Sequence, residues 1–437
     1  MYNYCITAFI LSFIYFWFLS NKKISYRASQ HLFRNPYINI GQGGNTLRQR
    51  YIWVLLTILF LAAFDMHAQV PILAPYARTL GATSVVIGML LGAYSMSNLL
   101  GHLIAGPFLD RYSKKLFICA GLFIAGWLLI GHGFSNKPDT LFWLRLIFGF
   151  TMAFVTPTCL ALLGQLARNP KEQGVFMIQK GMVLTAASIV SPAIGGLLAA
   201  RFGYGDAFFI FGGIMMGASL VGWLTLPSPK SLEKMGASQK QEGKAISPFR
   251  TMLVTYSIYP AYVCGFATTY ASGTIMYEIP LMLQQQNLPP TVSGILFSVM
   301  GLGSLIMLCQ FWLNRISPII RCSAALFVLA LTMYSLAVAA SASLYIPIFV
   351  VGACFGVLYP AMTVLLAQSA PPAIYGTAFS LYAAALSIGS IIGPMVAGVV
   401  QQEHQSYFIS FLVALAASLI TGWMYSLRTI GPKSLIR

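Results

Sequence analysis

The 437-residue sequence has few charged residues, 8% of its positions against about 25% in a typical soluble domain. Acidic residues are the scarcest: there are nine Asp and Glu beside 26 Lys and Arg, while 58% of the residues are hydrophobic. A single apolar core stops growing at roughly 250–300 residues and still needs a polar surface. This composition therefore excludes an ordinary soluble protein. It predicts an all-α polytopic membrane protein whose surface mostly faces lipid.

The sequence also lacks the patterns of several kinds of site. Its seven cysteines are scattered without a CxxC pair or a His cluster, so we interpret them as small hydrophobes and expect no metal site. No GxxxxGK[ST] loop is present, which argues against ATP hydrolysis by this chain. No Cys–His constellation suggests an intramembrane enzyme, and we expect neither enzymatic activity nor a cofactor.

Twelve apolar runs follow residue 50, each about the 20 residues that a membrane-spanning helix needs. They cover roughly 52–75, 85–108, 116–134, 141–166, 174–200, 207–226, 256–283, 291–313, 320–341, 343–367, 374–400 and 406–427. The long polar stretch 227–252 is predicted to link two pseudo-symmetric six-helix bundles, 51–226 and 253–427, with a tail at 428–437.

The positive charges of this arrangement fall mostly on one side. The side of the linker receives 21 of the 26 Lys and Arg residues, and the opposite loops receive three. Because Lys and Arg accumulate in cytoplasmic loops, the linker and the C-terminus are predicted to be cytoplasmic, in a protein of the inner membrane. The basic excess thus indicates orientation, and we expect no nucleic-acid partner.

Residues 1–50 form an N-terminal extension with an apolar run at 4–20. Three interpretations stay open: an extra membrane span, a signal-like segment, and a misassigned start. In the third, residues 1–46 would not belong to the mature protein. The misassigned start is suggested by the sequence from Leu47, LRQRYIWVLL, in which basic residues directly precede the first span.

The two halves share internal spacings, as expected of a duplicated unit. A Gly–Pro pair eighteen residues apart occurs at 174–192 and again at 376–394. A pair eight residues apart occurs at 149–157 and at 352–360. Two such bundles around a midplane cavity are a known transporter architecture.

Several motifs resemble those of the major facilitator superfamily, in particular its twelve-span drug:proton antiporter branch. The loop GPFLDRYSKK resembles the family's loop signature, and the matching residues are Gly106, Asp110, Arg111, Lys114 and Lys115. RLIFG in the fourth span resembles its RxxxG pattern, beginning at Arg145. SPAIGG in the fifth span resembles the GPxxGG signature of exporters: Pro192, Gly195 and Gly196 match, while Ser191 replaces the first Gly. GSIIGP in the eleventh span carries the fuller GxxxGP form, with Gly389, Gly393 and Pro394.

The resemblance covers residues 51 to about 427. It implies that Asp110 of the gating loop meets a helix N-terminus of the other half, that Arg145 takes part in proton transfer, and that the proline–glycine motifs pack or kink helices. The implied function is proton-coupled export of a small amphipathic organic molecule by alternating access. Proton-coupled uptake of a small metabolite or nutrient on the same fold is the alternative.

Only two acidic residues lie within spans, Asp65 in the first and Glu278 in the seventh. A charged carboxylate inside a bilayer is costly, so such a group can serve to load and release a proton. We predict that Asp65 is the principal proton carrier and that Arg145 is its electrostatic partner. Glu278 has three interpretations: a second proton site, a cation-binding carboxylate, or a residue that reaches interfacial water.

Five side chains near these acids are predicted to line a substrate cavity: Phe64, Gln69, Tyr94, Asn98 and Tyr270. Gln69 follows Asp65 by four positions and so shares its helix face, and Pro71 should loosen that helix. An aromatic cavity with few charges suits an amphipathic solute. We expect a monomer whose partners are a small-molecule substrate, protons and the lipid bilayer.

Overall fold

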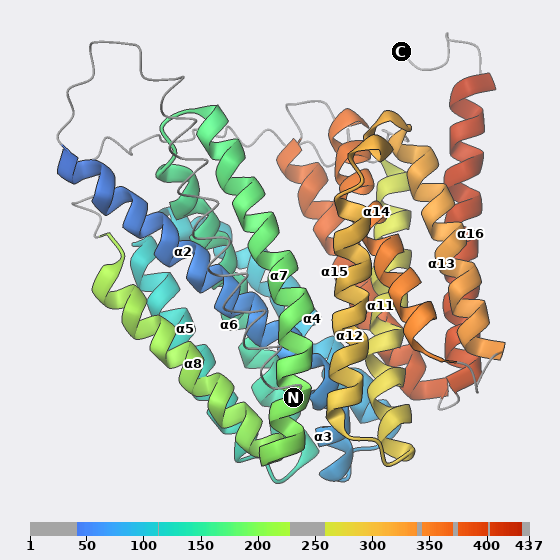
Figure 1. Ribbon diagram of the computed structural model, residues 1–437, viewed down its shortest axis with the longest axis horizontal. Coiled ribbons are helices and arrows are strands. Elements are labelled where there is room, and N and C mark those ends of the chain that lie inside the picture. Colours follow the sequence, from blue (N-terminus) through green and yellow to red (C-terminus); the bar gives the residue numbers. More distant parts are fainter. Residues whose placement is uncertain are drawn as a thin grey trace, which may run out of the picture. The chain divides into compact units, whose positions relative to one another are not determined.

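The computed structural model describes residues 42–111, 113–227, 258–338, 343–369, 375–400 and 403–430. The first half contains α2 (Gln42–Ala68), α3 (Val70–Thr79), α4 (Ser84–Arg111), α5 (Lys114–Gly133), α6 (Pro138–Gln165), α7 (Pro170–Phe202) and α8 (Tyr204–Thr225) (Figure 1). The second half contains α11 (Tyr259–Gln285), α12 (Pro290–Leu308), the short 3₁₀ helix η1 (Phe311–Arg315), α13 (Pro318–Val338), α14 (Tyr345–Ser369), α15 (Tyr375–Val400) and α16 (Glu403–Ile430). Residues 51–437 form one compact unit.

Eleven helices of the described ranges are long and apolar enough to cross a membrane. The remaining predicted span, the seventh, is α11, which has 27 residues but carries many Tyr, Thr and Gly residues. Because 17 of its residues are buried among other helices, α11 does not need an apolar surface. The prediction of an all-α polytopic membrane protein is confirmed. The apolar run at 4–20 lies outside the described residues.

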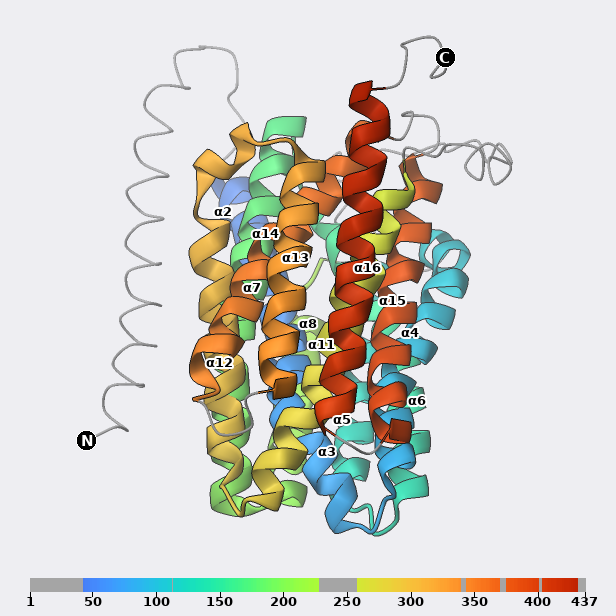
Figure 2. The same ribbon diagram turned by 90° about the vertical axis from the view of Figure 1, so that its right-hand side faces the viewer.

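Each half has its own apolar core. In the first half α5 packs on α8 and α4 on α6; in the second, α13 packs on α16 and α12 on α14 (Figure 2). Three residues of the second half, Tyr277, Leu281 and Ala397, join the core of the first half. The halves therefore have separate interiors that meet along a limited seam.

Two helix pairs form most of this seam, α4 with α15 and α7 with α12, and α11 adds contacts with α3 and α4. Glycines allow the backbones to touch, since a Cβ at these positions would collide with a carbonyl oxygen of the other half. On the first pair the contacts are Gly88 with Pro394 and Gly398 with Ser84; on the second they are Gly196 with Pro290 and Gly294 with Pro192.

These contacts gather at the end of the helices where α3 lies, the α3 side (Figure 1). There Tyr277 donates its hydroxyl hydrogen to the Ser84 carbonyl oxygen at 3.3 Å, and Gln284 Nε2 donates to the Pro75 carbonyl oxygen at 3.2 Å. Toward the other end, the linker side, where α8 ends and α11 begins, a Cβ at Gly174 or Gly181 of α7 would meet nothing within 4 Å. The described contacts between the halves thus close the α3 side.

The eighth predicted span, 291–313, extends too far. α12 ends at Leu308, and the apolar residues that follow it form η1, a short turn before α13. A residue before proline is disfavoured in a helix, so Ser317 stays outside and α13 begins at Pro318. Apolar character alone therefore did not mark the end of this helix.

The first span is broken at Gln69, which separates α2 from α3. Pro71 lacks an N–H group and cannot bond to the carbonyl four residues earlier. Backbone hydrogen bonds still span the break, since the Gln69 N–H donates to the Asp65 carbonyl oxygen at 3.2 Å and the Leu73 N–H donates to the Gln69 carbonyl oxygen at 2.9 Å. The break predicted from Pro71 is present, one turn after Asp65.

Candidate functional site

Three buried polar side chains form a hydrogen-bonded chain in the first half. Gln69 Nε2 donates to Asp65 Oδ2 at 2.8 Å, and an Arg145 guanidinium nitrogen donates to Gln69 Oε1. Asp65 is 2% exposed and Arg145 7%, while Gln69 is completely buried. The helix break thus places an amide between a carboxyl and a guanidinium, and α6 supplies the guanidinium.

Asp65 keeps one oxygen unused. Its Oδ1 is buried and has no hydrogen-bond partner among the described residues. Burial of a carboxylate with an unsatisfied oxygen is costly, and a proton on that oxygen removes the charge. The geometry therefore suits a carboxyl group that gains and loses a proton at Oδ1.

The guanidinium of Arg145 lies close to two neighbouring aromatic rings. Its central carbon is 5.0 Å from the ring centroid of Tyr94 and 5.7 Å from that of Phe148. Cation–π attraction of this kind can exceed about 2 kcal/mol where water is excluded. The rings hold a positive charge in the interior of the bundle without a direct ion pair to Asp65.

His132 on α5 was not predicted as a site residue, but it lies in the same region. It is completely buried, stacks on Phe208 with 5.3 Å between ring centroids, and contacts Phe148 edge-on at 6.2 Å. Its Nδ1 is 2.7 Å from the Leu128 carbonyl oxygen. This last hydrogen bond orients the ring, and the packing extends the aromatic wall behind Arg145.

The predicted cavity residues do not come together as one group. Phe64 packs in the core of the first half, 6.4 Å from the ring of Phe211, and Tyr270 is buried where α11 meets Gly393 of α15. Asn98 is half-buried and donates to the Gly149 carbonyl oxygen at 3.0 Å, which ties α4 to α6. Only Gln69 and Tyr94 of the five touch the Asp65–Arg145 region.

Glu278 is separate from this chain. It lies on α11 in the second half and is 4% exposed, next to the Tyr277 that bonds across the seam. Its position near the α3 side is compatible with each of the three interpretations drawn from the sequence.

The residues of the loop and glycine motifs lie in several different places. Gly106, Asp110 and Arg111 end α4, and their side chains are outside the described set; Lys114 and Lys115 begin α5. Gly195 packs its backbone against the Ala68 carbonyl oxygen, at the break beside Gln69. Gly389 and Gly393 instead pack within the second half, against α11.

The two hydrogen bonds of Gln69, with Asp65 and with Arg145, predict that replacing this residue destabilises the protein. Replacing Gln69 with Leu leaves buried groups of Asp65 and Arg145 without partners, which should lower the free energy of unfolding by about 1–3 kcal/mol. The measurement is the thermal unfolding midpoint of the purified protein in detergent. Gln405→Leu, at an exposed position of α16, is the matched control and should leave the midpoint unchanged. Equal midpoints for the two variants would contradict the bridging role.

The fold and this buried site define a class: a helical membrane protein of two bundles with an ionisable chain inside one of them. Residues 55–394 and 317–435 match the Major Facilitator Superfamily, and the chain belongs to this family of transporters. The resemblance noted in the sequence is thereby confirmed.

The matches to curated relatives cover most of this chain and nearly all of each relative. The chain is 25% identical over 391 residues to Multidrug resistance protein MdtG of Rahnella sp., covering 86% of this chain and 93% of the relative. It is 23% identical over 385 residues to Quinolone resistance protein NorA of Staphylococcus aureus, covering 85% and 95%. An uncharacterised MFS-type transporter of Methanocaldococcus jannaschii is 23% identical over 357 residues, covering 80% and 91%.

Solved structures show the same fold. A bacterial homologue of the human lysosomal transporter Spinster, inward-facing and occupied, aligns with a TM-score of 0.72 at 14% identity, covering 86% of this chain and 96% of that one. A peptide transporter of the POT family in complex with alafosfalin aligns with a TM-score of 0.71 at 14% identity, covering 87% and 94%. At these identities the likeness extends to the fold alone.

Proposed function

We propose that the protein exports a small amphipathic organic molecule in exchange for protons, by alternating access of its two halves. The observation that carries this proposal is the buried chain of Asp65, Gln69 and Arg145, in which one carboxyl oxygen is left unsatisfied. Relatives whose names state multidrug or quinolone resistance support the direction of transport. The protein works as a monomer without a cofactor, and 227–252 links halves that move as units.

In this proposal Asp65 is the proton carrier and its protonation selects a conformation. Burying a neutral carboxyl costs less than burying a charged one. Protonation therefore favours the state in which Asp65 is shielded, which is the state closed on the α3 side. Substrate binding then competes for the deprotonated state, so that one molecule moves out as a proton moves in.

The orientation follows from the distribution of charge. The sequence is predicted to place 21 Lys and Arg on the linker side and three opposite, so in this proposal the linker side is cytoplasmic and the α3 side faces outward. The seam described above then closes the outer side of a protein in the cytoplasmic membrane. In this proposal the substrate site is reached from the cytoplasm, where an exporter takes up its substrate.

Uptake by proton symport is the second candidate, and Ser191 in place of the first glycine of the exporter motif favours it. The two functions differ in the direction of flux under an imposed pH gradient. In reconstituted vesicles loaded with ethidium or a quinolone, acidifying the outside should accelerate release if the protein is an antiporter. Slower release instead would overturn export and favour symport. Vesicles with the same pH on both sides are the control.

A further inference from the structure

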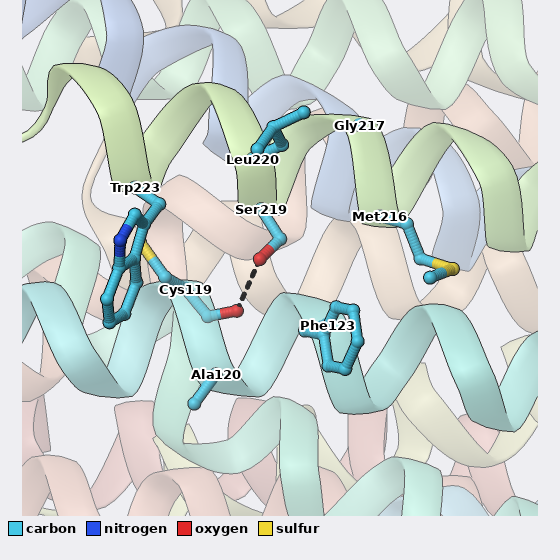
Figure 3. A pocket seen from close by; sticks show the side chains of 8 residues that line it. All are labelled: Cys119, Ala120, Phe123, Met216, Gly217, Ser219, Leu220 and Trp223. Carbon is cyan, nitrogen blue, oxygen red and sulfur yellow. Dashed lines mark hydrogen bonds between the residues drawn. The ribbon is translucent and has the colours of Figure 1, made fainter.

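A cavity lies apart from the Asp65 chain, in a groove between α5 and α8 (Figure 3). It has a volume of about 590 Å³ and is lined by Cys119, Ala120, Phe123, Met216, Gly217, Ser219, Leu220 and Trp223. The only hydroxyl of the lining, on Ser219, is already used, since it donates to the Cys119 carbonyl oxygen at 2.7 Å. The wall is otherwise apolar, so the groove suits a hydrocarbon group.

The groove opens on the lipid-facing surface of the first half. Phe123, Leu220 and Trp223 of its lining are 46%, 61% and 54% exposed. Since α5 and α8 are both membrane-spanning helices, the medium at this surface is the hydrocarbon of the bilayer. From Trp223 to Met216 the groove follows α8 for about 10 Å, at about 1.5 Å per residue.

One end of the groove carries positive charge. The ammonium of Lys115 is 5.9 Å from the ring centroid of Trp223, and it donates to the Leu226 carbonyl oxygen at 2.9 Å. An ammonium group has three donors, so two remain beyond this bond. The hydrogen bond to Leu226 therefore fixes a cation beside the groove wall on the linker side.

The start of α5 adds to this field. The 20-residue helix begins at Lys114, and Ser113 before it makes no side-chain capping bond. A helix N-terminus attracts anions because its first N–H groups lack intrahelical acceptors. Lys114, Lys115 and the first turn of α5 thus present donors and positive charge at one end of an apolar groove.

We propose that this groove binds one acyl chain of an anionic phospholipid of the linker-side leaflet. The phosphate lies at the first turn of α5 against Lys114 and Lys115, and the chain runs past Trp223 toward Met216. Positive charge at one end of the groove and apolar side chains along its length distinguish this site from the rest of the lipid-facing surface. The site is independent of the Asp65 chain and of the proposed export.

Two glycines of α8 allow a matched test. A Cβ at Gly217 or at Gly213 would meet nothing within 4 Å, so Phe can be introduced at either position, but only Gly217 lines the groove. Native mass spectrometry of the purified full chain counts bound phosphatidylglycerol, with phosphatidylcholine of the same chains as comparison. Gly217→Phe should hold one phosphatidylglycerol fewer than the wild type, and Gly213→Phe should match the wild type.

A second measurement does not depend on the folding of Gly217→Phe or Gly213→Phe. Brominated acyl chains quench tryptophan on contact, so brominated phosphatidylglycerol should quench the wild type more than brominated phosphatidylcholine, and Trp223→Phe should abolish the difference. Lys115→Gln should reduce the preference for phosphatidylglycerol about fivefold, the effect of one basic residue near a membrane surface. Equal binding of both lipids by the wild type, or equal phosphatidylglycerol counts for Gly217→Phe and Gly213→Phe, would overturn the proposal.

Discussion

Replacing Asp65 with Asn should reduce the accumulation ratio of a transported solute across reconstituted vesicles to about one, while exchange across the membrane continues. Asn has nearly the shape of Asp and can still accept from Gln69, so the Asp65–Gln69–Arg145 chain remains in place. It cannot bind and release a proton, however, and the transport cycle loses its link to the pH gradient. The measurement compares ethidium movement with and without the gradient.

Asp206→Asn is the matched control for this substitution. Asp206 lies exposed in the first turn of α8, and its replacement removes the same charge without touching the buried chain. We expect wild-type accumulation for Asp206→Asn. An Asp65→Asn protein that still accumulates the dye as the wild type does would exclude Asp65 as the proton carrier.

Replacing Gly196 with Val should open the seam on the α3 side. A Cβ at this position collides with the carbonyl of Pro290 in the other half, and backbone atoms cannot rotate away as a side chain can. Overpacking of this kind costs about 1–3 kcal/mol, which is roughly a 5- to 150-fold shift between two conformations. Turnover should fall because the state closed on the α3 side is rarely reached.

The opening can be detected as the labelling of a buried position. Ser293 is 2% exposed on α12 beside the seam, and Ser293→Cys in a background without native cysteines should react with an impermeant maleimide faster when Gly196→Val is present. Gly213→Val, at a position with open space on α8, is the control. Unchanged labelling with Gly196→Val would show that the seam tolerates the added side chain.

The sequence predicts the helices of this protein well because its surface is lipid. Apolar runs long enough to cross a bilayer leave few other solutions, and Pro71 marks the break of the first span. The prediction fails where an apolar stretch forms a turn. The apolar residues of η1 were assigned to the eighth span, although they form a short 3₁₀ helix after α12.

The candidate site was harder to predict than the helices. The rarity of acids within spans singled out Asp65, and the cost of a buried guanidinium singled out Arg145. The sequence does not fix how each helix is rotated, so Gln69 was assigned to a substrate cavity rather than to the bridge between these two. For the same reason Phe64 was placed in the cavity, whereas it packs in the core of its own half.

The most direct test of the account is whether protonation of Asp65 sets the conformation of the two halves. Spin labels at Lys137→Cys and Ser343→Cys, both exposed on the α3 side, report the separation of the halves without any knowledge of the substrate. Acidification should shift the wild-type distance distribution toward the short distances of the closed α3 side. Asp65→Asn should favour those short distances to the same extent at every pH, whereas a pH-dependent shift equal to that of the wild type would contradict the account.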